Sequence, residues 1–219
     1  MSSKIFSAAV VGLDAELIEV EAETGGGELG SFSIVGLPDL AVSESRERVR
    51  SAVRNSGLDF PKLKVTVNLA PADLKKQGPS YDLPIAVSVL LAGNKLVPKV
   101  ALNRALFVGE LALSGLVRPV AGILPTALRA AAAGFKTLYV PTGNAAEAKL
   151  VPDLDIRPVR HLKDLLGHLS GQAEIPAFAQ REINFEDIES VFDFTHIRGQ
   201  EYAKRAFEIA AAGGHNLLM

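Results

Sequence analysis

The 219-residue sequence contains no cysteine and no tryptophan, and only 6% of its residues are aromatic. Without cysteine the chain forms neither disulfides nor thiolate metal sites, which is typical of the reducing cytoplasm. It also lacks any run of about 18 apolar residues, the length that a membrane-spanning helix needs, and no signal peptide is recognisable. Its four histidines are scattered rather than paired at ligand spacing. We therefore expect a cytoplasmic protein with no membrane segment and no metal centre.

The charges are unevenly distributed, although the net charge is only −2. The stretch 13–30 carries six acids and no base, whereas 44–76 carries eight bases against four acids. Four of these bases are closely spaced arginines that can contact phosphates: Arg46, Arg48, Arg50 and Arg54. The alternative is that they form the solvated face of one helix.

Hydrophobic periodicity predicts an α+β fold with a mixed sheet. Strands are expected at 4–12, 16–23, 31–35 and 64–69, with a helix after 36–39 and a buried helix over 80–91. Later strands alternate with helices as far as residue 169. The polar stretch 171–187 reads as a linker. Beyond it we expect a helix over 200–212 and an apolar strand beginning with HNLLM.

The stretch KKQGPSYDLPIA contains a serine, Ser80, that admits two interpretations. A serine becomes a nucleophile only when a base within hydrogen-bond reach removes its proton, for example a lysine whose pKa is lowered by burial. Lys75 and Lys76 precede it in a polar loop, where we expect both to be solvated. Ser80 also suits the start of a helix, with Asp82 in the first turn.

GPS at 78–80, together with RPVAGILPTALRAAAAGFKTLYVP at 118–141, resembles the proteolytic domain of Lon protease. The resemblance implies a Lon-like fold of the ribosomal-protein-S5-domain-2 type and places the nucleophile at Ser80. The position of the lysine that would activate it holds Leu124, which can neither accept nor hold a proton. The small residues expected after the serine are replaced by Tyr81 and Asp82. We therefore expect the fold to be kept and the catalytic dyad to be lost.

Longer segments resemble the ComM/YifB family of magnesium-chelatase-like AAA+ ATPases. They are VGLPDLAVSESRERVRSAV at 35–53, VTVNLAPADLKKQGPSYDLPIA at 65–86, FVGELALSGLVRPVAGILP at 107–125 and DFTHIRGQEYAKRAFEIAAAGGHNLLM at 193–219. The resemblance implies a Lon-like N-terminal domain over 1–170, a linker over 171–187 and the truncated start of an AAA+ ATPase domain over 188–219. It also implies a hexameric, ATP-driven motor acting on DNA in branch migration during transformation.

In that family the strand after GGHN leads into a phosphate-binding loop, whose amides cradle phosphates and whose lysine reaches the β- and γ-phosphates. The chain ends at Met219, before such a loop, so we expect ATP and Mg²⁺ to serve the longer protein and not to bind tightly here. What remains is a segment that, by the resemblance, lies near the adenine base of ATP and that we call the base-side box: Ile197, Arg198, Gly199 and Gln200. The alternative for the box is simply a helix start.

The function expected from the resemblance is an accessory, non-catalytic domain of a DNA-processing motor. Its arginine cluster is the candidate surface for DNA or a neighbouring subunit, although no aromatic stacking platform is interleaved with it. Two alternatives remain: a peptidase or peptide-handling domain that uses Ser80, and a magnesium-chelatase-like subunit.

Overall fold

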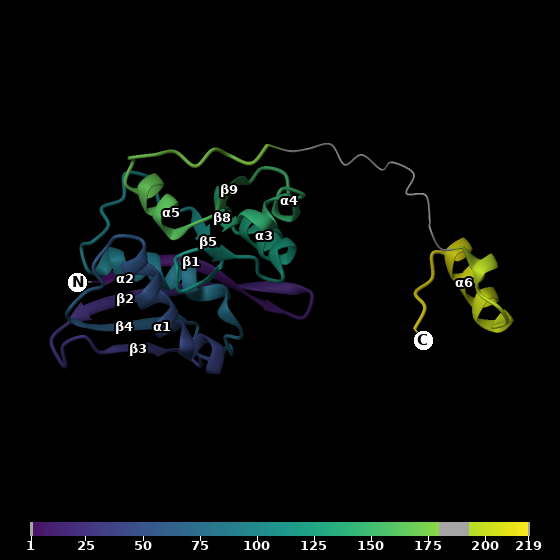
Figure 1. Cartoon of the computed structure of the whole chain (residues 1–219), viewed down its shortest axis with the longest axis horizontal. Coiled ribbons are helices and arrows are strands. Elements are labelled where there is room, and N and C mark those ends of the chain that lie inside the picture. Colours follow the sequence, from purple (N-terminus) through teal and green to yellow (C-terminus); the bar gives the residue numbers. More distant parts are fainter. Residues whose placement is uncertain (1, 180–192, 219) are drawn as a thin grey trace. The chain divides into compact units, whose positions relative to one another are not determined.

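The computed structural model describes residues 2–179 and 193–218 (Figure 1). The chain divides into two compact units, Met1–Arg181 and Glu182–Met219. Most of the second half of the expected linker, and the first residues of the expected ATPase domain, lie outside the described residues. None of the described helices is long and apolar enough to cross a membrane.

The first unit is built on a seven-stranded mixed sheet. A long antiparallel hairpin of β1 (Ser2–Val11) and β2 (Asp14–Gly25) occupies its middle. The other strands are β3 (Phe32–Val35), β4 (Lys64–Ala70), β5 (Ala105–Phe107), β8 (Thr137–Pro141) and β9 (Asp155–Val159). The strand order is β3-β4-β2-β1-β5-β8-β9, in which only the pairs β1–β2 and β2–β4 are antiparallel. The expectation of a mixed sheet is confirmed.

Helices cover both faces of this sheet and form two hydrophobic clusters. Successive strand residues point to opposite faces. Thus Phe107 joins the cluster under α1 (Leu40–Asn55), α2 (Asp82–Ala92) and α5 (Leu162–Leu169). Its neighbour Leu106 joins the cluster under α3 (Ile123–Ala132) and α4 (Ala145–Ala148). A small hairpin of β6 (Glu110–Leu111) and β7 (Val117–Arg118) lies beside the start of α2.

Helices α1 and α2 differ in how much of their surface is buried. In α1 a stripe of buried residues that includes Val42, Val49 and Val53 faces the core, and Asp39 caps the first turn by accepting from the Val42 amide at 2.8 Å. In α2 nearly every residue is buried, which agrees with its continuous apolar sequence. Helix α2 contacts both α1 and strand β6.

The first part of the expected linker packs against the first unit. The Phe178 amide donates to the Ile156 carbonyl in β9 at 2.8 Å, and Ile175 is buried at 8% exposure. The Ile175 amide also donates to Nδ1 of His168 at 3.1 Å. The packed body thus continues past residue 170 at least to Phe178.

The described part of the second unit holds a short 3-10 turn, Phe194–His196, and helix α6 (Glu201–Gly213). The rings of Phe194 and Phe207 pack at 5.8 Å between centroids. The expected helix is confirmed, but the strand expected to begin with HNLLM is wrong, since residues 215–218 form no strand. A strand needs a hydrogen-bonding partner strand, and none lies among the described residues of this unit.

Candidate functional site at the start of helix α2

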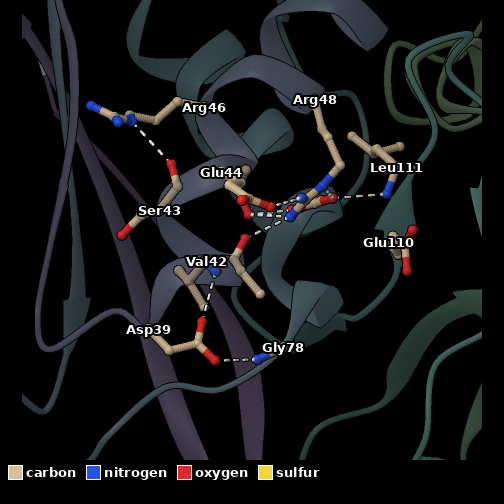
Figure 2. Close-up of polar contacts among 12 residues, drawn as sticks. Asp39, Val42, Ser43, Glu44, Arg46, Arg48, Gly78, Glu110 and Leu111 are labelled. Atoms are coloured by element: carbon tan, nitrogen blue, oxygen red, sulfur yellow. Dashed lines mark hydrogen bonds and ion pairs between the residues drawn. The ribbon is translucent and has the colours of Figure 1, made fainter.

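Two loops join where α1 and α2 begin. The Asp39 amide donates to the Lys76 carbonyl at 3.1 Å, and the Lys76 amide donates to the Leu37 carbonyl at 3.2 Å. The second carboxylate oxygen of Asp39 accepts from the Gly78 amide at 3.1 Å (Figure 2). One aspartate therefore caps α1 and also fixes the Gly-Pro-Ser turn.

Ser80 does not cap α2, so the interpretation of Ser80 as the first residue of the buried helix is wrong. It lies in the middle of a 3-10 turn, Pro79–Tyr81, and α2 begins at Asp82 without a side-chain cap. Gly78 has a φ of +78°, which favours glycine and directs the chain into this turn. The Ser80 carbonyl accepts from the Gly109 amide at 2.9 Å, so the turn is tied to the segment before β6.

The carboxylate of Asp82 is fully buried and is the centre of a polar network that includes Arg48 and Leu111. Arg48 binds it with two parallel donors, Nε to Oδ2 at 2.6 Å and Nη2 to Oδ1 at 3.0 Å. The Ser45 hydroxyl donates to the same carboxylate, and so does the Leu111 amide at 3.1 Å. Arg48 is held further by the Ala41 carbonyl at 2.8 Å. The network thus joins α1, α2 and β6.

The two charges of this pair shift each other's titration. Burial raises the pKa of the Asp82 carboxyl, while the hydrogen bonds from Arg48 and Ser45 oppose that rise. The hydrogen bond to Asp82 raises the pKa of the Arg48 guanidinium, against desolvation. Burial also raises the pKa of the neighbouring Tyr81 hydroxyl to about 12. The carboxylate, the guanidinium and the phenol of this region are thus each perturbed by burial or by their partners.

Lys76 is fully buried, so the expectation that it is solvated is wrong. Its ammonium group donates to the Pro71 carbonyl, beneath the loop that follows β4. Burial lowers the pKa of Lys76. Lys75, next to it, is exposed as expected. The sequence does not predict this burial, because an irregular loop has no periodic hydrophobic pattern that marks which side chains face inward.

Leu124 lies near the start of α3, half-buried against the cluster on the α3 face of the sheet. Its amide donates to the Glu147 carboxylate at 2.9 Å. Tyr81, beside Ser80, belongs instead to the cluster under α1 and α2. The position that the Lon resemblance assigns to the activating lysine thus holds an apolar side chain that packs in a core.

The four arginines of α1 do not form a single exposed cluster. Arg48 binds the buried Asp82 carboxylate. Arg46 points away from Arg48 and donates to the Ser43 carbonyl at 3.0 Å (Figure 2). Arg50 donates to the Gly30 carbonyl at 2.8 Å and lies over the Phe60 ring at 5.1 Å. Only Arg46 and Arg54 are exposed. The interpretation of all four as one contact face is corrected accordingly, because two of them bind inside the fold.

The base-side box lies in the second unit, between the 3-10 turn and α6. Ile197 is 44% exposed, and Gly199 and Gln200 both have positive φ, +71° and +60°. Arg198 is exposed as well. The box therefore precedes the helix rather than forming its first turn, and its role in binding a base stays a prediction.

One signal in the sequence points to the Asp82 network. Asp82 stands directly before the apolar run LPIAVSVLLA, and a carboxylate at the edge of so apolar a helix needs a partner. The partner, Arg48, lies 34 residues earlier, so spacing alone does not identify it. Among the described residues, no group of three or more histidine or acidic side chains could hold a metal ion.

The sequence of the chain is similar to two kinds of known protein: longer bacterial proteins that include ComM, and Lon proteases. An uncharacterized protein of Mycobacterium tuberculosis is 43% identical over 99% of this chain, and the competence protein ComM of Haemophilus influenzae is 41% identical over 98%. The chain spans about 42% of the length of both relatives. The Lon protease of Methanosarcina barkeri is 30% identical over 71% of this chain and 20% of its own length.

Two family models match this chain. The model for subunit ChlI of Mg-chelatase covers residues 18–144, which include Arg48, Asp82 and Leu124. A second model, magnesium chelatase subunit ChlI, covers 193–219. The first match spans more than half of the chain and contains the whole network at the start of α2. The chain therefore belongs to the family of the ChlI subunit of Mg-chelatase.

Proposed function

We propose that the first unit is a Lon-protease-like accessory domain, without peptidase activity, of a ring-forming, ATP-dependent motor that processes DNA. The motor would act in branch migration or recombination during transformation, in the cytoplasm, with ATP and Mg²⁺ bound by the part of the longer protein that follows. The observation that carries this proposal is the 41% identity to a competence protein over 98% of this chain. The family's name keeps magnesium chelation as a further alternative.

The geometry around Ser80 supports the non-catalytic part of the proposal. A serine nucleophile needs a base, and the position of the family lysine holds Leu124 in the α3-side core. Two residues after Ser80, the carboxylate of Asp82 accepts from four donor groups of α1 and β6. The turn is thus built into a structural network.

A salt-dependent DNA titration tests the accessory role. The 219-residue chain and a protein of the full length of its relatives are compared by fluorescence anisotropy on labelled duplex and single-stranded oligonucleotides. If the logarithm of the affinity falls linearly with the logarithm of the salt concentration in both proteins, a direct contact by this domain is supported. Absence of DNA binding in the longer protein would overturn the proposal.

The buried Lys76 favours a second candidate, a peptidase that uses Ser80. A lysine with a pKa lowered by burial, four residues before a serine, has one property of a general base. Its ammonium group, however, donates to the Pro71 carbonyl. A serine-reactive fluorophosphonate probe tests this candidate. Labelling that disappears in both Ser80→Ala and Lys76→Met would establish the peptidase and contradict the non-catalytic proposal.

A further inference from the structure

Lysines from separate elements surround two adjoining cavities of the first unit. The larger cavity, of about 620 Å³, is lined by Lys95, Lys99 and Lys163 and lies between the ends of α1 and α2 and helix α5. The second, of about 510 Å³, shares Lys95 and adds Lys62. We call these four lysines the lysine track. The segment 83–109, which supplies two of them, carries three bases and no acid.

Within the described residues, the charges of the track have no ion-pair partner. No carboxylate of the described residues lies within 4.0 Å of any of these four ammonium groups. Two acids, Asp59 and Asp164, also line the cavities, so the lining carries four positive and two negative charges. Arg48 and Arg157, by contrast, each bind a carboxylate at 2.6–2.8 Å. The track is therefore a locally positive surface on a chain of net negative charge.

The backbone positions these lysines firmly. The Lys95 amide donates to the Leu90 carbonyl at 2.8 Å, which ties it to the last turn of α2. The Lys99 amide donates to the Leu169 carbonyl at 2.8 Å, and its aliphatic stem lies against Gly171. Lys163 lies in the first turn of α5. The backbone of Lys95 and Lys99 and the stem of Lys99 are thus held against packed elements, while all four side chains are exposed to solvent.

We propose that the lysine track binds the phosphate backbone of DNA. The inference rests on the proposed function and names the surface that performs it. Four point charges over two adjoining cavities, none with a carboxylate within 4.0 Å among the described residues, fit a polyanion. They fit sequence-independent binding because the lining of the two cavities contains no arginine, whose forked donors can read base edges. An acidic peptide would need apolar anchors. Leu96 and Leu166 in the larger cavity are almost fully buried, whereas Val97 there and Leu63 in the second cavity are exposed, so an acidic peptide is the competing occupant that the test below separates from DNA.

The test compares two charge-reversed variants of the longer protein with equal net charge. The track variant is Lys95→Glu/Lys99→Glu/Lys163→Glu. The control variant, Arg46→Glu/Arg54→Glu/Lys75→Glu, reverses three exposed bases at α1 and its neighbouring loop. All six side chains are exposed, so both variants should keep the wild-type melting curve. The measurement is the slope of log affinity against log salt for a labelled duplex.

We expect the track variant to lose about one unit of slope per lysine, together with most of its affinity at low salt, while the control keeps the wild-type slope. If the wild-type protein binds DNA and the track variant binds with the same affinity and slope, the track is overturned and the proposed function stands. If the wild-type protein does not bind DNA, both the lysine track and the proposed function are contradicted. Track-dependent binding of a polyglutamate probe with track-independent binding of DNA would instead assign the surface to a protein partner.

Discussion

Two regions of the first unit differ in whether their positive side chains have ion-pair partners among the described residues. At the start of α2, Arg48 is bound by a buried carboxylate, a hydroxyl and a backbone carbonyl. At the other end of α2, Lys95, Lys99 and Lys163 line a cavity, and no carboxylate of the described residues lies within 4.0 Å of their ammonium groups. The first arrangement holds the fold together, and the second leaves charge available to a ligand. A count of bases in the sequence does not separate the two, because it does not show which bases meet a carboxylate in the fold.

Among these variants, Arg48→Met should lower the free energy of unfolding most. It leaves the Asp82 carboxylate buried without a counter-charge, and we expect a loss of about 3–5 kcal/mol in the free energy of unfolding. The measurement is urea unfolding followed by circular dichroism. Arg46→Met, on the exposed side of the same helix, is the matched control and should change the free energy by less than about 0.5 kcal/mol.

The double variant Arg48→Met/Asp82→Asn separates a buried unpaired charge from lost packing. Asparagine is neutral and keeps an oxygen to accept from the Leu111 amide, so the double variant should be more stable than Arg48→Met alone. A double variant as unstable as Arg48→Met would show that packing, rather than the charge of Asp82, dominates this region.

Acidification should destabilise the first unit through His168. Its Nδ1 accepts from the Ile175 amide, so the neutral ring carries its proton on Nε2 and donates to the Tyr139 hydroxyl at 3.1 Å. Burial lowers the pKa of His168, with Arg157 acting in the same direction and Asp155 and Glu174 opposing it. The unfolded chain therefore binds the proton more readily, and stability is complete above about pH 6.5 and falls below it.

The slope of this loss is at most about 1.4 kcal/mol per pH unit. The measurement is urea unfolding at several pH values between about 5 and 7.5. His168→Asn keeps an acceptor for the Ile175 amide without a titrating group, and it should flatten the curve in this window. An equally steep curve in His168→Asn would assign the pH dependence to other groups.

The track variant should differ little from wild type in stability. Because its lysines have no ion-pair partners in the described chain, we expect each reversal to change the free energy of unfolding by no more than about 0.5 kcal/mol. The measurement is the same urea unfolding. A large loss would mean that the lysines support the fold, for example by interacting with the carbonyl ends of α2 and α5.

Ser80→Ala should have the smallest effect. The residue contributes its carbonyl to Gly109, and the substitution keeps that contact. We expect unchanged DNA binding and a stability within about 1 kcal/mol of wild type, checked by thermal unfolding and anisotropy. Loss of a hydrolytic activity in this variant would contradict a structural role for the turn.

Local signals in the sequence predict much of the fold. Alternation over 16–23 predicts β2, and Asp39 before a helix-forming stretch marks the start of α1, as the structure confirms. The continuous apolar run predicts a buried α2, but not the 3-10 turn that holds Ser80 before it. That turn depends on hydrogen bonds to Gly109, which is distant in the sequence.

The candidate site is less visible in the sequence than the fold. The correspondence of Ser80 and Leu124 to a catalytic pair comes from resemblance, and the structure adds that Leu124 packs in a core. The burial of Lys76 and the pairing of Arg48 with Asp82 depend on contacts between separate elements. The lysine track depends on them too, since helix ends far apart in the chain bring its members together. Periodicity reports which face of an element is buried, not which elements meet.

The lysine track, and not the α1 arginines, is the surface that we propose to contact DNA. The most direct measurement is the change in amide chemical shifts when a short duplex is titrated into the isotope-labelled 219-residue chain. We expect the largest changes to cluster at residues 94–100 and 162–171, with little change at residues 40–48. Changes concentrated on α1 around Arg46, with none at the track, would contradict it.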